Sequence, residues 1–232
     1  MTGLPVPDPA AGTAPGPVVL LPAARLPALP PSLPQRPYPK AVQALGRLVL
    51  AGLGVRLDGG FADVPRSVLV GWPHTSNLDG IVALAGVAVC GLRPAIVVKR
   101  SLFRFGAGAI LRAFGGVPVR RGVPGGVVGQ QVEAFGEAET AGRGLVFAIS
   151  PEGTRSRGNG WRSGWHRVSV GAGVPVSVLA FDWGRSRRER RLVVLGAVVP
   201  TGDLAADTAA VEALLAGVVG RHPGRMTKAN AA

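Results

Sequence analysis

Short, continuously apolar segments alternate along this chain with longer segments in which apolar residues recur at helical spacing. Continuous apolar runs are typical of strands buried on both faces, in sheets that helices cover. The alternation therefore predicts an α/β layer architecture. The expected strands are residues 67–72, 94–99, 144–150, 175–181 and 191–199, with 116–121 as a strand or turn. The expected helices are residues 41–55, 78–92, 102–114, 127–142 and 205–219.

The N-terminal part of the chain differs from the rest. Residues 1–37 are rich in Pro, Ala and Leu and carry almost no charge, and a run such as PALPPSLPQRP cannot sustain a helix or a sheet. We predict a flexible arm over residues 1–37 and one domain over residues 38–232. The alternative is that leucines of the arm contact the domain or lipid.

The chain is strongly basic, with 26 Lys and Arg against 13 Asp and Glu, a net charge of +13. Such a surplus attracts polyanions, anionic substrates and anionic membrane surfaces. Nucleic-acid binding is the non-enzymatic alternative, suggested by arginines between two expected strands. Aromatic residues for base stacking are nearly missing there, so we expect a solvated hairpin and no nucleic-acid partner. These arginines are Arg185, Arg187, Arg188, Arg190 and Arg191, with Trp183 as their aromatic neighbour.

Several features bear on location and cofactors. The longest apolar candidate, residues 80–92, falls short of the ~20 residues of a spanning helix, and the first residues lack the basic start of a secretory signal. We expect a cytoplasmic protein, peripheral on the inner face of the membrane and docked through Arg100, Arg104 and Arg112. Cys90 is the single cysteine, and His166 and His222 have no ligand-like neighbours, so no metal site is expected.

The first candidate site is the segment PHTSNLD, in which His74 follows an expected strand and Asp79 lies in the first turn of the next helix. Functional groups of α/β proteins gather at such turns. A carboxylate five residues after a histidine can fold back to the imidazole, which suits a general base. The alternative is structural: Ser76 or Asn77 caps the helix, Asp79 interacts with its dipole, and His74 is incidental.

Two further segments can bind an anion. In SPEGTRS, Gly153 lets the backbone bend, while Thr154 and Arg155 can donate to a phosphate. In GGVPVRR, two glycines precede Arg120 and Arg121. Each segment alone also reads as an ordinary polar or basic turn. The chain lacks the G-x-S-x-G of serine hydrolases and the G-x-x-x-x-G-K-[ST] of P-loop enzymes.

Together, in this order, the segments resemble the phospholipid and glycerol acyltransferase superfamily, which includes the lysophosphatidic acid acyltransferases. PHTSNLD resembles its HxxxxD motif, KRSLF with GGVPVRR its second block, SPEGTRS its third and GVPV its fourth. The chain departs from the family at Ser150, where Phe is usual, at Arg120, and in the tryptophan-containing segment 158–166. The last departure leaves the acceptor open.

The resemblance implies an α/β fold with a mixed sheet flanked by helices. It implies O-acyl transfer from an acyl-CoA or acyl carrier protein thioester to a lysolipid acceptor, with 1-acylglycerol-3-phosphate as first choice and another lipid or polar acceptor as the alternative. His74 and Asp79 would be the catalytic pair. The substrate would be bound by Arg121, Glu152, Gly153, Thr154 and Arg155, with Glu152 accepting from an acceptor hydroxyl or positioning an arginine. No cofactor or metal is implied.

Overall fold

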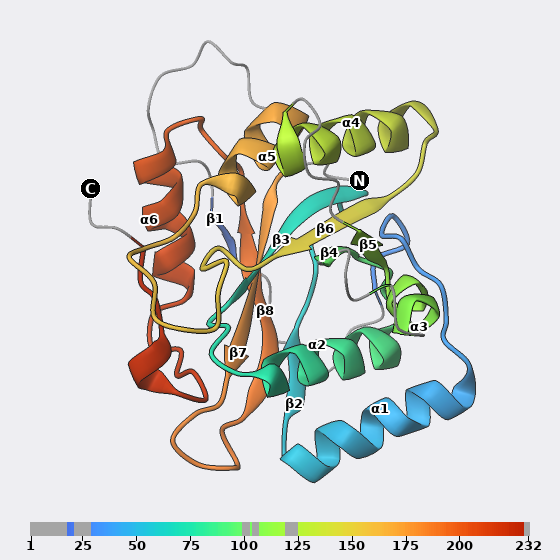
Figure 1. The fold of residues 1–232 in the computed structure, drawn as a ribbon, viewed down its shortest axis with the longest axis vertical. Coiled ribbons are helices and arrows are strands. Elements are labelled where there is room, and N and C mark those ends of the chain that lie inside the picture. The colour runs from blue at the N-terminus through green and yellow to red at the C-terminus, as the bar shows by residue number, and fades with distance from the viewer. Residues whose placement is uncertain (1–17, 21–28, 99–102, 104–106, 119–124, 230–232) are drawn as a thin grey trace.

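A mixed sheet forms the centre of the molecule in the computed structural model, which describes residues 18–20, 29–98, 103, 107–118 and 125–229 (Figure 1). Its eight strands run in the order β1-β8-β7-β3-β6-β4-β5, and β2 pairs with β8 off this path. Strands β7, β3, β6, β4 and β5 are parallel, whereas β8 is antiparallel to β7. The strands are β1 (Val18–Leu20), β2 (Arg56–Gly59), β3 (Arg66–Trp72), β4 (Ala95–Val98), β5 (Gly116–Pro118), β6 (Leu145–Ile149), β7 (Val176–Asp182) and β8 (Arg191–Val198).

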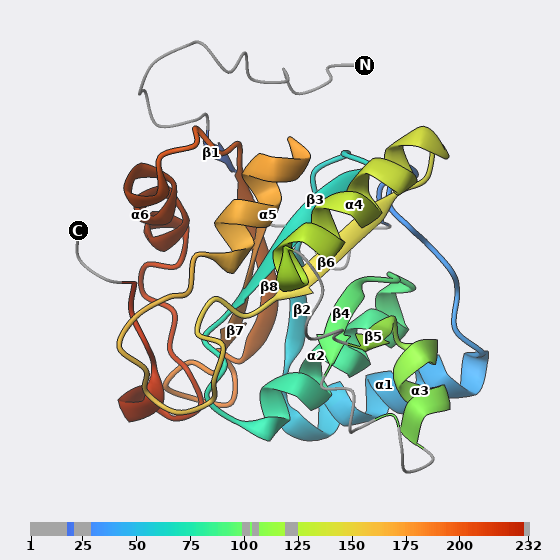
Figure 2. The ribbon, with the colours of Figure 1, turned by 45° about the horizontal axis from the view of Figure 1, so that its top comes forward.

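Helices cover both faces of this sheet, which confirms the predicted α/β class. Figures 1 and 2 show α4, α5 and α6 on one side and α1, α2 and α3 on the other. The helices are α1 (Lys40–Leu53), α2 (Asn77–Cys90), α3 (Ala107–Ala113), α4 (Gly126–Thr140), α5 (Gly164–Ala172) and α6 (Leu204–Leu214), followed by a 3₁₀ turn at Pro223–Arg225.

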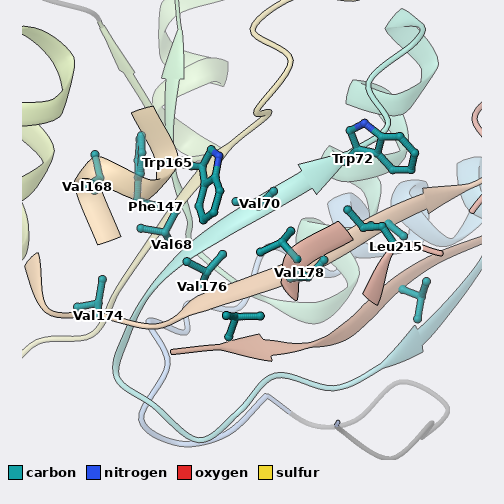
Figure 3. Close-up of a cluster of buried hydrophobic side chains, with 14 of the residues drawn as sticks. Val68, Val70, Trp72, Phe147, Trp165, Val168, Val174, Val176, Val178 and Leu215 are labelled. Atoms are coloured by element: carbon teal, nitrogen blue, oxygen red, sulfur yellow. The ribbon is translucent and has the colours of Figure 1, made fainter. Parts of the chain in front are cut away.

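The main core lies between the sheet and helices α4, α5 and α6. Side chains alternate between the two faces of a strand, so Val68, Val70 and Trp72 of β3 point to the same side. There they pack with Trp165 of α5 and with Leu215, which follows α6 (Figure 3). Val68 and Val70 are fully buried, which fits the continuous apolar sequence of a central strand.

The opposite face of the sheet is covered by α2, and α1 packs on α2. Leu69 of β3 is buried on this face, in a cluster with Leu92 and Val146. Gly46 sets the distance between the two helices, because a Cβ added there would lie 2.9 Å from the backbone oxygen of Ala85. A larger residue at position 46 would push α1 away from α2.

The predicted elements are present with shifted ends, and the sequence patterns missed β1, β2 and α5. The expected helix at 205–219 ends at Leu214, and the described part of the one expected at 102–114 is the shorter helix Ala107–Ala113. The two missed strands, β1 and β2, are short and lie at the sheet edge. They form through pairing with β8, a distant segment, so their own sequence does not predict them.

The described part of the N-terminal segment, residues 18–20 and 29–37, contacts the body of the domain. Strand β1 pairs antiparallel with β8. Residues 29–38 pack against the body of the domain, where Leu29 and Leu33 join the cluster around Leu69. Tyr38 is buried and stacks on Phe114 with ring centroids 5.0 Å apart. Prolines do not prevent this packing, because an extended segment needs no helical hydrogen bonds.

Candidate active site

The sheet order explains why residues far apart in sequence meet at one place. Strand β3 lies between β6 and β7 and is parallel to both. The carboxyl ends of these strands therefore meet at one edge of the sheet, where α/β proteins bind ligands. His74 follows β3, Glu152 follows β6 and Trp183 follows β7.

Asp79 is the most constrained group of the site. Its side chain is fully buried in the first turn of α2. Oδ2 accepts hydrogen bonds from the backbone N–H groups of Thr75 and Ser76, both at 2.7 Å. Oδ1 accepts one from the indole Nε1–H of Trp183, also at 2.7 Å. Three donors hold this carboxylate. Ser76 is the N-cap of α2, one of the two residues that the structural alternative named, and Asp79 completes its capping box and also lies beside His74.

His74 lies beside this carboxylate, with its Nδ1 3.7 Å from Oδ2 of Asp79. This distance is too long for a hydrogen bond, and Asp79 acts on the imidazole through its electrostatic effect, which favours the protonated ring. The other ring nitrogen, Nε2, is left for a substrate, and the side chain is 28% exposed. Burial lowers the pKa of His74 below its usual value, and the positive charge of Arg155 lowers it further, while Asp79 opposes the change. His74 is therefore a neutral imidazole at neutral pH, the form that accepts a proton.

Glu152 has a different role from the expected contact with an acceptor hydroxyl. Its residue is only 2% exposed. Oε2 accepts from the backbone N–H of His74 at 2.5 Å, and Oε1 accepts from that of Thr227 at 3.0 Å. Both carboxylate oxygens therefore bind backbone N–H groups, and one of these hydrogen bonds fixes the backbone position of His74. Burial raises the pKa of Glu152, and these two hydrogen bonds counteract it in part.

The residues of the SPEGTRS turn that follow Glu152 face solvent beside His74. Gly153 has a φ of 62°, and the residues that follow it, Thr154 and Arg155, are exposed. The guanidinium of Arg155 donates to Oδ1 of Asn77 in the first turn of α2, which brings its charge close to His74. The second arginine expected to bind substrate, Arg121, lies outside the described residues.

The expected docking arginines are only partly described. Arg100 and Arg104 lie outside the described residues. Arg112 is exposed at the end of α3, and its guanidinium lies 5.4 Å from the ring centroid of Phe103.

An apolar cavity of about 500 Å³ opens beside His74. It lies between α2 and the sheet and is lined almost entirely by apolar side chains, including Ile81 and Leu84 of α2 and Phe181 of β7. His74 lies just before α2, and Cys90, which also lines the cavity, is the last residue of this helix. A helix of this length spans ~21 Å. Apolar lining residues therefore occur along the whole length of α2, from its start beside His74 to its end.

Two features of the cavity wall bear on its contents. Gly80, next to Asp79, lines the cavity, and a Cβ added there would meet nothing within 4 Å. The glycine therefore leaves space open where a larger residue would fill it. Cys90 stays a neutral thiol, because burial raises its pKa to about 11.

Local patterns missed two groups around the site and one buried pair away from it. Trp183 holds Asp79, as described above. Thr227 accepts at its backbone oxygen from the indoles of Trp72 and Trp161, which ties the C-terminal segment to the end of β3. The prediction that His166 has no ligand-like neighbour is wrong, because its Nε2 lies 2.8 Å from Oδ2 of Asp207 and both side chains are buried. This pair joins α5 to α6 and does not line the cavity.

Over residues 18–20, 29–98, 103, 107–118 and 125–229, no three His, Cys, Asp or Glu side chains gather closely enough to hold a metal ion. No helix within those same ranges is both long and apolar enough to span a bilayer.

Comparison with known proteins gives one family and one fold. The model of the family named Acyltransferase matches residues 62–184, more than half of the chain. No curated protein matches it significantly. The crystal structure of the 1-acyl-sn-glycerophosphate (LPA) acyltransferase PlsC from Thermotoga maritima is similar in fold, with a TM-score of 0.50 and 17% sequence identity. The match covers 78% of this chain and 81% of that one.

Proposed function

The chain belongs to the acyltransferase family, and from this premise we propose that it transfers a fatty acyl group from a thioester to a hydroxyl of a glycerolipid precursor. The observation that carries the proposal is the position of His74, a neutral imidazole in the wall of an apolar cavity. The cavity suits an acyl chain, and the imidazole suits deprotonation of the attacking hydroxyl.

The proposed reaction uses no group beyond the chain and its substrates. Nε2 of His74 takes the proton of the acceptor hydroxyl while the hydroxyl oxygen attacks the thioester carbonyl carbon. The tetrahedral intermediate collapses with cleavage of the carbon–sulfur bond, and the imidazolium returns the proton to the departing thiolate. Asp79 stabilises the imidazolium between these steps. The products are an ester and a free thiol.

We propose 1-acylglycerol-3-phosphate as the acceptor and acyl-CoA or acyl carrier protein as the donor. The PlsC enzyme of similar fold is named for this acceptor class. Arg155 is exposed next to His74, so it can bind a phosphate close to the reacting hydroxyl. Arg121 remains the second candidate for the same phosphate, on the basis of its motif. We no longer propose Glu152 as a substrate-binding residue, because its carboxylate accepts hydrogen bonds from two backbone N–H groups.

The test is an acyl transfer assay with purified protein. Acyl-CoA and acyl carrier protein thioesters of several chain lengths are combined with a panel of lysolipids, and the products are identified by mass spectrometry. We expect phosphatidic acid from 1-acylglycerol-3-phosphate, and no product with His74→Ala. If product forms only with another lysolipid, the proposed acceptor is wrong and the proposed acyl transfer stands. The absence of any product in the whole panel would refute the proposal.

We also propose that the protein acts at the cytoplasmic surface of the membrane. Helix α1 exposes Leu45 and Leu48, with 59% and 68% of each residue accessible, and the same helix exposes the cations Lys40 and Arg47. An exposed apolar pair with positive charge on the same helix suits an anionic bilayer surface. Binding to vesicles should rise with their anionic lipid content and fall with salt. It should weaken in the double variant Leu45→Glu/Leu48→Glu, and equal binding by that variant would exclude α1 as the docking surface.

A further inference from the structure

Trp183 is a buried residue whose side chain reaches the centre of the proposed active site. It directly follows β7, and only 7% of its surface is exposed. Its indole Nε1–H donates to Oδ1 of Asp79 at 2.7 Å, across 104 residues of sequence. A hydrogen bond to a charged, buried acceptor is among the stronger ones in proteins, and its loss leaves the acceptor unsatisfied.

The indole is itself held in place by several contacts. The backbone N–H of Trp183 donates to the backbone oxygen of Val219 at 2.8 Å. The guanidinium groups of Arg190 and Arg221 lie over the ring, 5.5 and 4.9 Å from its centroid. Arg190 also donates to the backbone oxygen of Leu53 at the end of α1. Cations over an aromatic ring attract it, so these contacts keep the indole from turning away from Asp79.

The division of donors between the two carboxylate oxygens is the decisive feature. Oδ2 is the oxygen that faces Nδ1 of His74, and it is fixed by backbone N–H groups from the turn that carries His74. Oδ1 is fixed by a different part of the chain, the indole N–H of Trp183, which directly follows β7. Without the indole donor, the carboxylate would be held through one oxygen only and could rotate about its bond to Cβ.

We propose that Trp183 is a positioning residue for the reaction, which holds the Asp79 carboxylate so that Oδ2 faces His74. This inference rests on the proposed acyl transfer. The action is indirect: Trp183 orients Asp79, and Asp79 orients and stabilises His74. Substrate binding does not involve Trp183, so its loss lowers kcat and leaves KM for donor and acceptor unchanged.

The experiment compares two substitutions that separate the two functions of the indole, apolar packing by its ring and donation of a hydrogen bond by its N–H group. Trp183→Phe keeps a six-membered apolar ring and removes the N–H donor. Trp183→His loses the six-membered ring but carries Nε2–H at nearly the distance from Cβ at which the indole carries Nε1–H. At pH 8 this histidine is neutral, and the carboxylate selects its Nε2–H form. Trp165→Phe is the matched control, because Trp165 is 1% exposed in the core and lies outside the site.

We expect kcat of Trp183→Phe to fall by roughly tenfold or more, the equivalent of one charge-assisted hydrogen bond. Trp183→His should recover part of this loss, although it packs less well. Trp165→Phe should lose stability and keep kcat. A role of Trp183 in packing alone predicts the opposite order, with Trp183→Phe more active than Trp183→His. That order, or wild-type kcat in Trp183→Phe, would overturn the inference.

A stability measurement separates this inference from the proposed function. Free energies of unfolding of Trp183→Phe, Asp79→Ala and the double variant form a cycle that needs no catalytic assay. The two substitutions should be coupled, with Trp183→Phe less harmful when Asp79 is already removed. Additive effects would refute the contact itself. If the two substitutions are coupled but the wild-type protein transfers no acyl group, the contact between Trp183 and Asp79 is real and the proposed function is refuted, together with the positioning role.

Discussion

The burial of Glu152 leads to the most specific prediction for a single substitution, Glu152→Gln. The carboxylate accepts from two backbone N–H groups, those of His74 at 2.5 Å and Thr227 at 3.0 Å. Glutamine has one carbonyl oxygen, so its amide N–H₂ group must face one of these donors. The substitution loses a charge-assisted hydrogen bond, ~1.5–3 kcal/mol, and leaves a buried N–H without an acceptor. Removal of a buried charge returns part of this energy.

We therefore expect a loss of about 2 kcal/mol in the free energy of unfolding, which lowers Tm by about 4–8 °C in a domain of this size. The pKa of Glu152 is raised above the ordinary value of 4.5, so the folded wild type binds more protons than the unfolded chain between these two values. Its stability therefore falls as pH rises through that window. Glu152→Gln should lack this dependence.

Thermal and denaturant unfolding measure the stability, and the acyl transfer assay measures kcat and KM. Because Glu152 holds the backbone of His74, kcat should fall. The control is Glu139→Gln, at an exposed ion pair in which Oε1 of Glu139 lies 2.6 Å from Arg66, and exposed pairs contribute at most about 1 kcal/mol. Unchanged Tm with a raised acceptor KM would refute the reasoning, because that result belongs to a residue that binds substrate.

Three further predictions concern the site and its cavity. kcat/KM should fall as pH decreases through the pKa of His74, which lies below 6.5. Arg155→Gln should move this fall to higher pH, because Arg155 lowers the pKa of His74, and an unchanged pH profile in this variant would contradict the role of His74 as the base. Gly80→Val should fill the cavity and abolish transfer of long acyl chains, whereas Gly136→Val on an open helix surface should not; equal chain-length profiles would exclude the cavity as the acyl site. Arg121→Ala should raise the acceptor KM about tenfold or more through loss of a charge-assisted bond, and a change in donor KM alone would reverse the role.

The parts of the fold and site that sequence could predict are those encoded by neighbouring residues. The apolar run of β3 indicated a buried strand, and the residues after it indicated a turn into α2. His74 and Asp79 are five positions apart, so one turn of backbone brings them together whatever the rest of the fold. For the same reason the SPEGTRS motif indicated an exposed donor turn after β6.

The remaining parts depend on contacts that no local pattern reports. Glu152 stands in a polar turn and was expected to accept from an acceptor hydroxyl or to position an arginine. The parallel pairing of β6 with β3 instead brings its carboxylate to the backbone N–H of His74. The N-terminal prolines indicated an arm, and Leu29 and Leu33 pack on the sheet only because the cluster around Leu69 leaves apolar surface for them. The short strands β1 and β2 are stabilised by β8, not by their own sequence.

Asp79 illustrates why the structural and catalytic interpretations of a motif can both hold. In the capping box of α2, its carboxylate accepts from the N–H groups of Thr75 and Ser76, which fix its position. A partner for His74 must be fixed as well, because a mobile carboxylate cannot stabilise an imidazolium. The capping box therefore places the Asp79 carboxylate beside His74 as part of folding α2. What the cap does not provide is control of the second oxygen, and in this chain the indole of Trp183 supplies it.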